Sequence, residues 1–234
     1  MKLGIIGAME IEVEILKSRL VSPHVTRVGP MEFCQGRLAG LDVVIVMCGV
    51  GKVHAAMCAH TLCTQFGVTH IVNTGVAGSL DPELDIGDVL VSVDAVQHDM
   101  DVHYLGYPIG RVPGLDVTAF PADEGLVKRA FEASEALRPG HTKLGRVATG
   151  DQFVNSAEQK SKIIADTGAN CTEMEGGAIA QAAYVNHVPF VILRAISDKA
   201  DDSAQMDYPT FEAMAARNCA AVTEAMAAAL AKGE

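Results

Sequence analysis

The sequence predicts a three-layer α/β fold, and three observations lead to that class. Short apolar runs of strand character alternate with longer segments of helical periodicity along the whole chain. Glycines follow several of the apolar runs, which is typical of strand-to-helix connections. No linker, repeat or low-complexity tract interrupts the 234 residues, so we expect a single domain over residues 1–234.

The first predicted elements are a short apolar strand at residues 2–9 and a helix at residues 9–20. At about 3.6 residues per turn, Glu10 and Glu14 share the polar side of that helix, whereas Glu12 falls within the apolar arc. A carboxylate that faces the core needs a partner or a chemical task. We therefore interpret Glu12 as a functional residue; the alternative is an acid at a helix start that tilts toward solvent.

Glycine turns mark the next elements. Residues 31–38 and 41–48 predict a hairpin, and Gly49 and Gly51 then form a tight turn before a helix that continues to about residue 66. This turn matches neither a Walker loop nor a dinucleotide fingerprint. The segment VTHIVNTGVAGSL predicts a strand followed by a turn at Gly75 and Gly78, where backbone amides could approach a small ligand.

The central part of the chain predicts a strand that reaches His98. Four potential metal ligands, His98, Asp99, Asp101 and His103, lie at its end, but the two histidines would point to opposite faces, so we expect no metal site. A Gly/Pro-rich loop then covers residues 105–123 and is of the kind that lines pockets or makes contacts. After it, we expect a helix over residues 123–137 and a strand that ends at residue 150.

The last third of the chain carries the most charge at element ends. We expect a helix capped by Ser156, an acidic helix start at residues 173–175, an apolar strand at 188–196, and a closing helix at 209–230 with Pro209 near its first turn. Arg194 lies inside the apolar strand and must find an anion there. Glu175 and Asp198 are the nearest candidates, and a structural ion pair and a functional site are equally open.

Composition narrows the function classes. A net charge of −11 without a basic run argues against a nucleic-acid surface, and no apolar stretch approaches membrane-spanning length. The apolar N-terminal run is too short for a signal peptide. The six cysteines lie mostly in apolar segments without a CxxC pair, so we expect buried thiols in a reducing, cytoplasmic compartment.

Seven ordered motifs link the chain to a known family. They are GIIGAMEIEVE (4–14), GVGKVHAA (49–56), NTGVAGSL (73–80), QHDMDV (97–102), GDQFV (150–154), EMEGGAIA (173–180) and RAISDKAD (194–201). With these motifs the chain resembles the 5′-methylthioadenosine/S-adenosylhomocysteine nucleosidases of the purine nucleoside phosphorylase superfamily. The resemblance implies an αβα sandwich with a central mixed β-sheet, a homodimer, and no metal or cofactor.

The resemblance also implies a reaction and a catalytic set. Such enzymes hydrolyse the bond between adenine N9 and a 5′-thio-substituted ribose, in methionine salvage and S-adenosylmethionine recycling. By resemblance, Asp198 delivers a proton to adenine N7, Glu12 activates water, and Glu175 accepts hydrogen bonds from the ribose hydroxyls. Arg194 would organise Glu175 and the water, and Ser197 would orient Asp198.

A wider substrate-binding set carries over in the same way. The Phe153 ring and the Val154 backbone would hold adenine. The other implied contacts within the chain are Met9, Val50, Val76, Ala77, Gly78, Glu173, Met174 and Tyr208. Val102, Leu105 and Pro113 would reach the pocket of the partner subunit.

Three positions depart from the family pattern. Val76 stands where many relatives have serine, and Leu105 and Tyr208 stand where relatives often have phenylalanine. These departures bear on the preference for the 5′-substituent. The sequence leaves open the ranking among methylthioadenosine, S-adenosylhomocysteine, 5′-deoxyadenosine and aminofutalosine.

Three other functions are possible on the same scaffold: phosphorolysis, nucleoside binding without catalysis, and hydrolysis of another nucleoside. Related phosphorylases bind phosphate with arginines near the first glycine turn and near the segment NTGVAGSL. At the first glycine turn this chain has Met9, Glu10 and Glu12, and at NTGVAGSL it has Asn73. An anionic Glu12 would repel phosphate, which favours hydrolysis. A non-catalytic nucleoside-binding protein would not need Glu12 and Asp198 together. Within hydrolysis, an aminofutalosine nucleosidase of menaquinone synthesis is the alternative.

Overall fold

The computed structural model describes residues 1–233, and Glu234, the last residue of the expected domain, lies outside the described residues. The strands are β1 (Lys2–Gly7), β2 (Val21–Val28), β3 (Met31–Leu38), β4 (Leu41–Met47), β5 (His70–Ser79), β6 (Val89–Gln97), β7 (Phe120–Pro121), β8 (Thr142–Thr149), β9 (Cys171–Glu173) and β10 (Phe190–Asp198). The helices are α1 (Glu10–Ser18), α2 (Lys52–Gln65), η1 (His103–Leu105), α3 (Glu124–Leu137), α4 (Ala157–Thr167), α5 (Gly176–Val185) and α6 (Ala204–Lys232).

All ten strands join one sheet. Its order is β10-β6-β8-β9-β5-β1-β4-β3-β2, and β7 pairs with β6. β1 runs parallel to β4 and β5, whereas β3 runs antiparallel to β4, so the sheet is mixed, as expected. β5 also pairs in parallel with β10, which closes the strands β10, β6, β8, β9 and β5 into a ring. No local sequence pattern predicts that closure.

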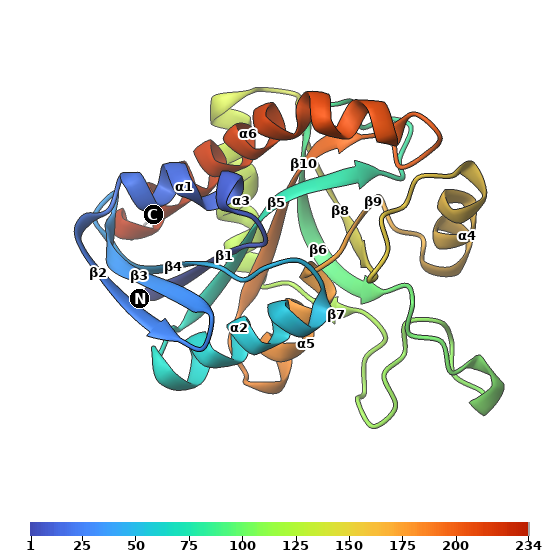
Figure 1. The fold of residues 1–234 in the computed structure, drawn as a ribbon, viewed down its shortest axis with the longest axis horizontal. Helices are drawn as coiled ribbons and strands as arrows, with labels where there is room; N and C mark the ends of the chain where they lie inside the picture. Colours follow the sequence, from blue (N-terminus) through green and yellow to red (C-terminus); the bar gives the residue numbers. More distant parts are fainter. Residues whose placement is uncertain (234) are drawn as a thin grey trace.

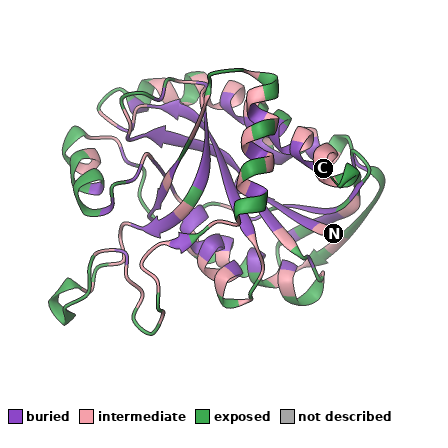
Figure 2. Cartoon of the chain, turned by 180° about the vertical axis from the view of Figure 1, so that it is seen from behind, coloured by how far each residue is buried: buried purple, intermediate pink, exposed green. Residues whose placement is uncertain are grey.

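Helices cover both faces of this sheet. Figure 1 shows α1, α3 and α6 on one side and α2 and α5 on the other, with α4 at the far end. Buried apolar side chains form a separate cluster on each side. The central strands are buried through most of their length, while the outer helix surfaces are exposed (Figure 2). The α/β sandwich is therefore confirmed; the single domain over 1–234 stays a prediction.

Several local predictions are confirmed. In α1, Glu10 and Glu14 are exposed, whereas Glu12 is only 3% exposed. The hairpin of β3 and β4 turns at Ala39 and Gly40, as expected. The Ser156 hydroxyl accepts a hydrogen bond from the backbone N–H of Gln159 and so caps α4.

Three local predictions were wrong or incomplete. Gly75 and Gly78 are not in a turn; they lie inside β5, which continues to Ser79. The closing helix begins at Ala204, so Pro209 lies inside α6, where it lacks the N–H that would bond to the carbonyl four residues earlier. The edge strand β2 was not anticipated, because it is exposed along most of its length and contains Pro23, a poor strand residue.

Among residues 1–233, no helix is long and apolar enough to cross a membrane.

Candidate active site

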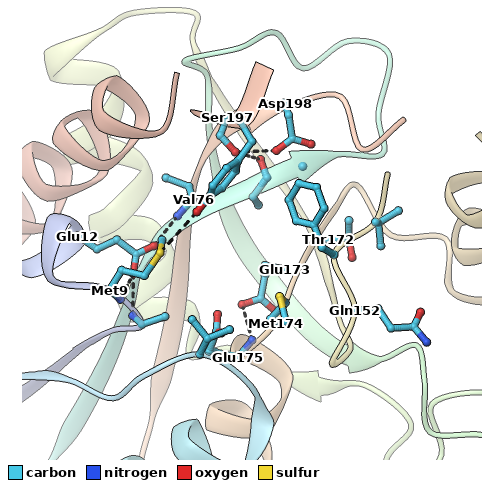
Figure 3. A pocket seen from close by; sticks show the side chains of 17 residues that line it. Met9, Glu12, Val76, Gln152, Thr172, Glu173, Met174, Glu175, Ser197 and Asp198 are labelled. Carbon is cyan, nitrogen blue, oxygen red and sulfur yellow. Dashed lines mark hydrogen bonds between the residues drawn. The ribbon is translucent and has the colours of Figure 1, made fainter. Parts of the chain in front are cut away.

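One cavity gathers the ends of several distant segments. Its volume, counted out to the open mouth, is about 590 Å³. It lies where β1, β5 and β10, which run parallel, reach their carboxyl ends. The lining residues, drawn in Figure 3, are Ala8, Met9, Glu12, Val50, Val76, Ala77, Gly78, Gln152, Phe153, Val154, Thr172, Glu173, Met174, Glu175, Ser197, Asp198 and Tyr208.

Glu12 is held on both carboxylate oxygens by backbone donors. Oε2 accepts hydrogen bonds from the N–H groups of Ala8 (2.7 Å) and Met9 (3.0 Å), and Oε1 accepts one from Val76 (3.1 Å). The bond to Met9 is half of a capping box, so the start of α1 orients this side chain. Burial raises the pKa of Glu12 above its ordinary value, although Arg194 and these three donors oppose that shift. Glu12 is thus a fixed, buried carboxyl group.

Arg194 forms a buried ion pair with two glutamates, one of which the sequence suggested. Its Nη2 donates to Glu173 and to the Asn73 side-chain oxygen (2.6 Å). Glu175 Oε2 lies 4.0 Å from the same nitrogen. The candidate anion Glu175 is therefore confirmed as the more distant partner, whereas Asp198 forms no ion pair with Arg194. The sequence analysis did not name the nearer partner, Glu173, because its approach to Arg194 depends on the pairing of β9 with β5.

Glu173 also organises the turn that presents Glu175. Besides Arg194, it accepts hydrogen bonds from the Thr149 hydroxyl and from the backbone N–H groups of Glu175 (3.1 Å) and Gly176 (2.7 Å). Glu175 Oε1 accepts from the N–H of Gly51 (2.8 Å), at the entrance to α2. Burial, followed by the neighbouring Glu173 charge, raises the pKa of Glu175 to about 7. Glu175 therefore changes its charge near neutral pH.

A β-bulge lies directly before Asp198. β10 and β5 pair Ile196 with Ala77 and Asp198 with Gly78, so Ser197 is an extra residue. Both Ser197 and Asp198 line the cavity. The expected alternation from Arg194 through Ile196 to Asp198 is interrupted at this last step.

Asp198 is oriented by two short hydrogen bonds. The Ser197 hydroxyl donates to Oδ2 (2.8 Å), and the backbone N–H of Ala200 donates to Oδ1 (2.8 Å). Burial raises the pKa of Asp198 despite these donors, and the charges of Asp207 and Asp201 act in the same direction. Asp198 is therefore better able to keep a proton than an exposed aspartate.

Two glycines of β5 leave the space that these side chains occupy. A Cβ on Gly75 would lie well under 3.0 Å from Arg194 Nη1 and Glu12 Oε1, and a Cβ on Gly78 would lie 2.7 Å from Asp198 Oδ1. Close approach, rather than a turn, explains both glycines.

Apolar and aromatic groups form the mouth of the cavity. The rings of Phe153 and Tyr208 meet edge to face with centroids 5.5 Å apart, and the Tyr208 hydroxyl lies 3.5 Å from the Met9 sulfur. Phe153 is 45% exposed, so its ring has a free face at the entrance. An aromatic wall beside four carboxyl groups suits a ligand with a flat base and a polar sugar.

Comparison with known proteins shows which family has this fold and site. A sequence model of the phosphorylase superfamily matches residues 2–228. The chain is 41% identical over 246 residues to a 5′-methylthioadenosine/S-adenosylhomocysteine nucleosidase of Treponema pallidum, covering 95% of this chain and 91% of the relative. The chain belongs to this nucleosidase family of the phosphorylase superfamily.

Solved nucleosidase structures share the fold over nearly the whole chain. One is a 5′-methylthioadenosine/S-adenosylhomocysteine nucleosidase from Neisseria meningitidis in complex with methylthio-immucillin-A, with a TM-score of 0.95 and 34% identity over 97% of this chain and 99% of that one. Another is a futalosine hydrolase of Helicobacter pylori, with a TM-score of 0.91 and 33% identity over 97% of each chain.

The nucleosidase residues expected from the sequence mostly meet at the cavity. All of the expected catalytic and substrate-binding residues of this chain line it, except Arg194, which lies behind Glu173, and the three assigned to a partner subunit. The sequence analysis missed Ala8, Gln152 and Thr172 as lining residues. Each directly adjoins an expected residue or lies inside a quoted motif, which is the signal that could have found them.

Val102, Leu105 and Pro113 lie elsewhere. They belong to the segment around η1 that projects away from the body of the nucleosidase fold, green at the lower right of Figure 1, and none lines the cavity. Leu105 is 71% exposed.

Within residues 1–233, no group of three His, Cys, Asp or Glu side chains is placed to hold a metal ion.

Proposed function

We propose that this chain hydrolyses the N-glycosidic bond of 5′-methylthioadenosine and S-adenosylhomocysteine, and also of 5′-deoxyadenosine, releasing adenine and the 5′-substituted ribose. The observation that carries the proposal is the meeting of Glu12, Glu175 and Asp198, from three distant segments, around one cavity. Membership of the nucleosidase family supports the substrate class.

The proposed chemistry passes through an oxocarbenium-like ribose while negative charge grows on the purine. Asp198 is the acid: its raised pKa favours the protonated form, from which it protonates adenine N7 and makes the base a better leaving group. The Ser197 hydroxyl keeps the carboxyl group pointed at the base. The proton thus ends on adenine as the C–N bond breaks.

The other two acids act on the sugar side. Glu12 accepts a proton from the attacking water, whose oxygen then bonds to the anomeric carbon. Glu175, as the carboxylate, accepts hydrogen bonds from the ribose hydroxyls and stabilises the sugar cation. Arg194 acts indirectly, since it holds Glu173, which holds the turn before α5.

Hydrolysis rather than phosphorolysis follows from the charge of the cavity. Among its 17 lining residues, all within the described part of the chain, there is no lysine or arginine, and three are glutamates. Phosphate binding needs donors or positive charge, and these carboxyl groups oppose it.

The deciding experiment is adenine release from methylthioadenosine with and without phosphate. We expect equal rates and a free 5-methylthioribose product; release that requires phosphate and gives ribose 1-phosphate would refute the proposal. Asp198→Asn should lower kcat by at least about 100-fold while nucleoside binding remains. Asp202→Asn is the matched control, because Asp202 lies four residues further along, is exposed and does not line the cavity.

A second substrate deserves the same assay. The likeness to a futalosine hydrolase at 33% identity favours aminofutalosine as an additional or alternative substrate. Competition between aminofutalosine and methylthioadenosine, read as the ratio of kcat/KM values, ranks them. Val76 and Tyr208 at the cavity wall are the residues whose exchange should change that ratio.

We also propose a cytoplasmic homodimer in which Val102, Leu105 and Pro113 close the partner's cavity at the 5′ end of the substrate. Exposed apolar side chains support such a surface: Val53 (69%) and Met57 (56%) on α2 are unusually exposed. Six free cysteines, five of them buried, are compatible with a reducing compartment.

The homodimer can be tested with one pair of variants. Leu105→Asp should raise the KM for methylthioadenosine and shift the sedimentation equilibrium toward monomer. Leu137→Asp on α3, at a site 49% exposed, is the control and should change neither. An unchanged dimer with an unchanged KM in Leu105→Asp would contradict this assignment.

A further inference from the structure

Three segments that the proposed reaction does not use directly are tied together beside the cavity. They are the start of α2, the segment after β6 and the segment after β8. Each carries one member of a charged cluster, which is Lys52, Asp99 and Asp151 respectively. All three belong to motifs that the sequence analysis singled out without finding a role for these side chains.

Asp99 is the junction of the cluster. Its Oδ1 lies 2.7 Å from the Lys52 ammonium group, and its Oδ2 accepts a hydrogen bond from the backbone N–H of Asp151 (3.0 Å). The side chains of Lys52 and Asp99 are each only 19% exposed, so solvent screens this ion pair less than a surface pair. One carboxylate therefore joins the start of α2 to the segment after β8.

Asp151 makes the return connection. Its Oδ1 accepts a hydrogen bond from the backbone N–H of Lys52 (2.8 Å), in the first turn of α2, where a carboxylate is favoured. Gly51, the residue before, has φ +95° and leaves room for this carboxylate, since a Cβ there would lie 3.1 Å from Oδ1. The two segments are thus joined at two points, once through each aspartate.

The joined segments carry opposite walls of the cavity. The Gly51 N–H donates to Glu175 Oε1 (2.8 Å), which is the ribose side of the proposed reaction. Two and three residues after Asp151 come Phe153 and Val154, which line the cavity on the proposed base side. A shift of either segment would therefore change the spacing between the base wall and the sugar carboxylate.

We propose that Asp99, Lys52 and Asp151 form a positioning cluster that sets this spacing for the nucleoside. The inference rests on the proposed function for the identity of the ligand. Gln97 anchors the cluster to the fold, because its side-chain oxygen accepts from Lys52 Nζ (3.2 Å) and its amide donates to Gln181 of α5 (2.5 Å). None of the three charged residues lines the cavity, so none is a catalytic residue.

Two single variants test the cluster. In Asp99→Asn, the amide has one acceptor oxygen and one NH₂ group, so it can satisfy either Lys52 or the Asp151 N–H but not both. In Lys52→Met, the ammonium group is removed while the apolar stem stays. The control is Asp42→Asn, which removes the same charge from an exposed pair with Arg37 on β3 and β4.

We expect each variant to raise the Kd of adenine, measured by calorimetry, and the KM of methylthioadenosine by about tenfold. The value of kcat should change less than about threefold, because Glu12 and Asp198 keep their contacts. The double variant should be no worse than either single variant, since both variants break the same Lys52–Asp99 contact and leave the bond from the Lys52 N–H to Asp151 in place. Asp42→Asn should behave as wild type.

Several results would overturn the inference. Wild-type adenine affinity in Lys52→Met would do so even if Asp99→Asn failed to fold. A lower melting temperature with unchanged Kd and KM would show a purely structural role. A raised KM with unchanged adenine affinity would place the effect at the 5′ end. Wild-type protein that binds adenine but releases none from methylthioadenosine would instead refute the proposed function and leave this inference standing.

Discussion

Gly75→Ala offers a direct test of how tightly the site is packed. The added methyl group would lie well under 3.0 Å from both Glu12 Oε1 and Arg194 Nη1, and those groups are held by backbone donors and a buried ion pair. Either Glu12 or β5 must therefore move by on the order of 1 Å, a displacement that can cost about 100-fold in rate. Overpacking of this kind also destabilises by roughly 1–3 kcal/mol.

The assay is adenine release together with chemical denaturation. We expect kcat/KM of Gly75→Ala to fall by about 100-fold while the protein stays folded at 25 °C. Gly4→Ala is the matched control: Gly4 is also in a buried strand, but its added methyl group would meet the flexible end of Leu62 at 3.1 Å. That variant should keep kcat within about twofold. A Gly75→Ala protein with less than a fivefold loss would refute the packing argument.

Two further predictions concern the buried charges. Arg194→Met leaves Glu173 buried without its cation, so the free energy of unfolding should fall by roughly 3–5 kcal/mol. The control, Arg37→Met, removes an exposed ion pair and should lower the free energy of unfolding by less than about 1 kcal/mol. Equal losses for the two variants in chemical denaturation would contradict this prediction. The folded pKa of Glu175, about 7, exceeds its ordinary value of 4.5, so the folded protein holds that proton more tightly and loses stability as pH rises between these values. The free energy of unfolding of Glu175→Gln should therefore equal that of the wild type near pH 4 and exceed it above pH 7 by on the order of 3 kcal/mol. A difference in melting temperature that does not depend on pH would count against this prediction. The wild-type kcat/KM should also fall below pH 7, as Glu175 becomes protonated, and a flat acid limb in the rate profile would oppose its role as the anion.

Local patterns in the sequence were enough for part of the site. Glu12 could be singled out because helical periodicity alone places it in an apolar arc, and the structure buries it there. Arg194 could be singled out because an arginine in an apolar strand requires an anion. Its nearer partner could not be predicted, because Glu173 reaches it through the short strand β9, whose three residues carry no strand pattern of their own.

Long-range pairing accounts for most of the rest. The strand-and-helix order was readable from periodicity, whereas the pairing of β5 with β10 joins segments more than 100 residues apart. The sequence predicts a turn at Gly75 because glycine most often marks turns, and only the proximity of α1 and β10 reveals the close approach that this glycine permits. The cluster around Asp99 depends on three segments whose proximity no local pattern encodes.

The bulge at Ser197 adds one residue to β10 without changing the β5 residue that Asp198 pairs with, because Ile196 pairs with Ala77 and Asp198 with Gly78. A chain one residue shorter at this point could keep that pairing, yet it would lose the Ser197 hydroxyl that donates to Asp198 Oδ2 and would shift the backbone that leads to the Ala200 N–H, the donor to Oδ1. Length change at this position is therefore expected to inactivate more completely than most substitutions. Among homologous proteins, an insertion or deletion here would be a sharper sign of lost activity than a changed side chain.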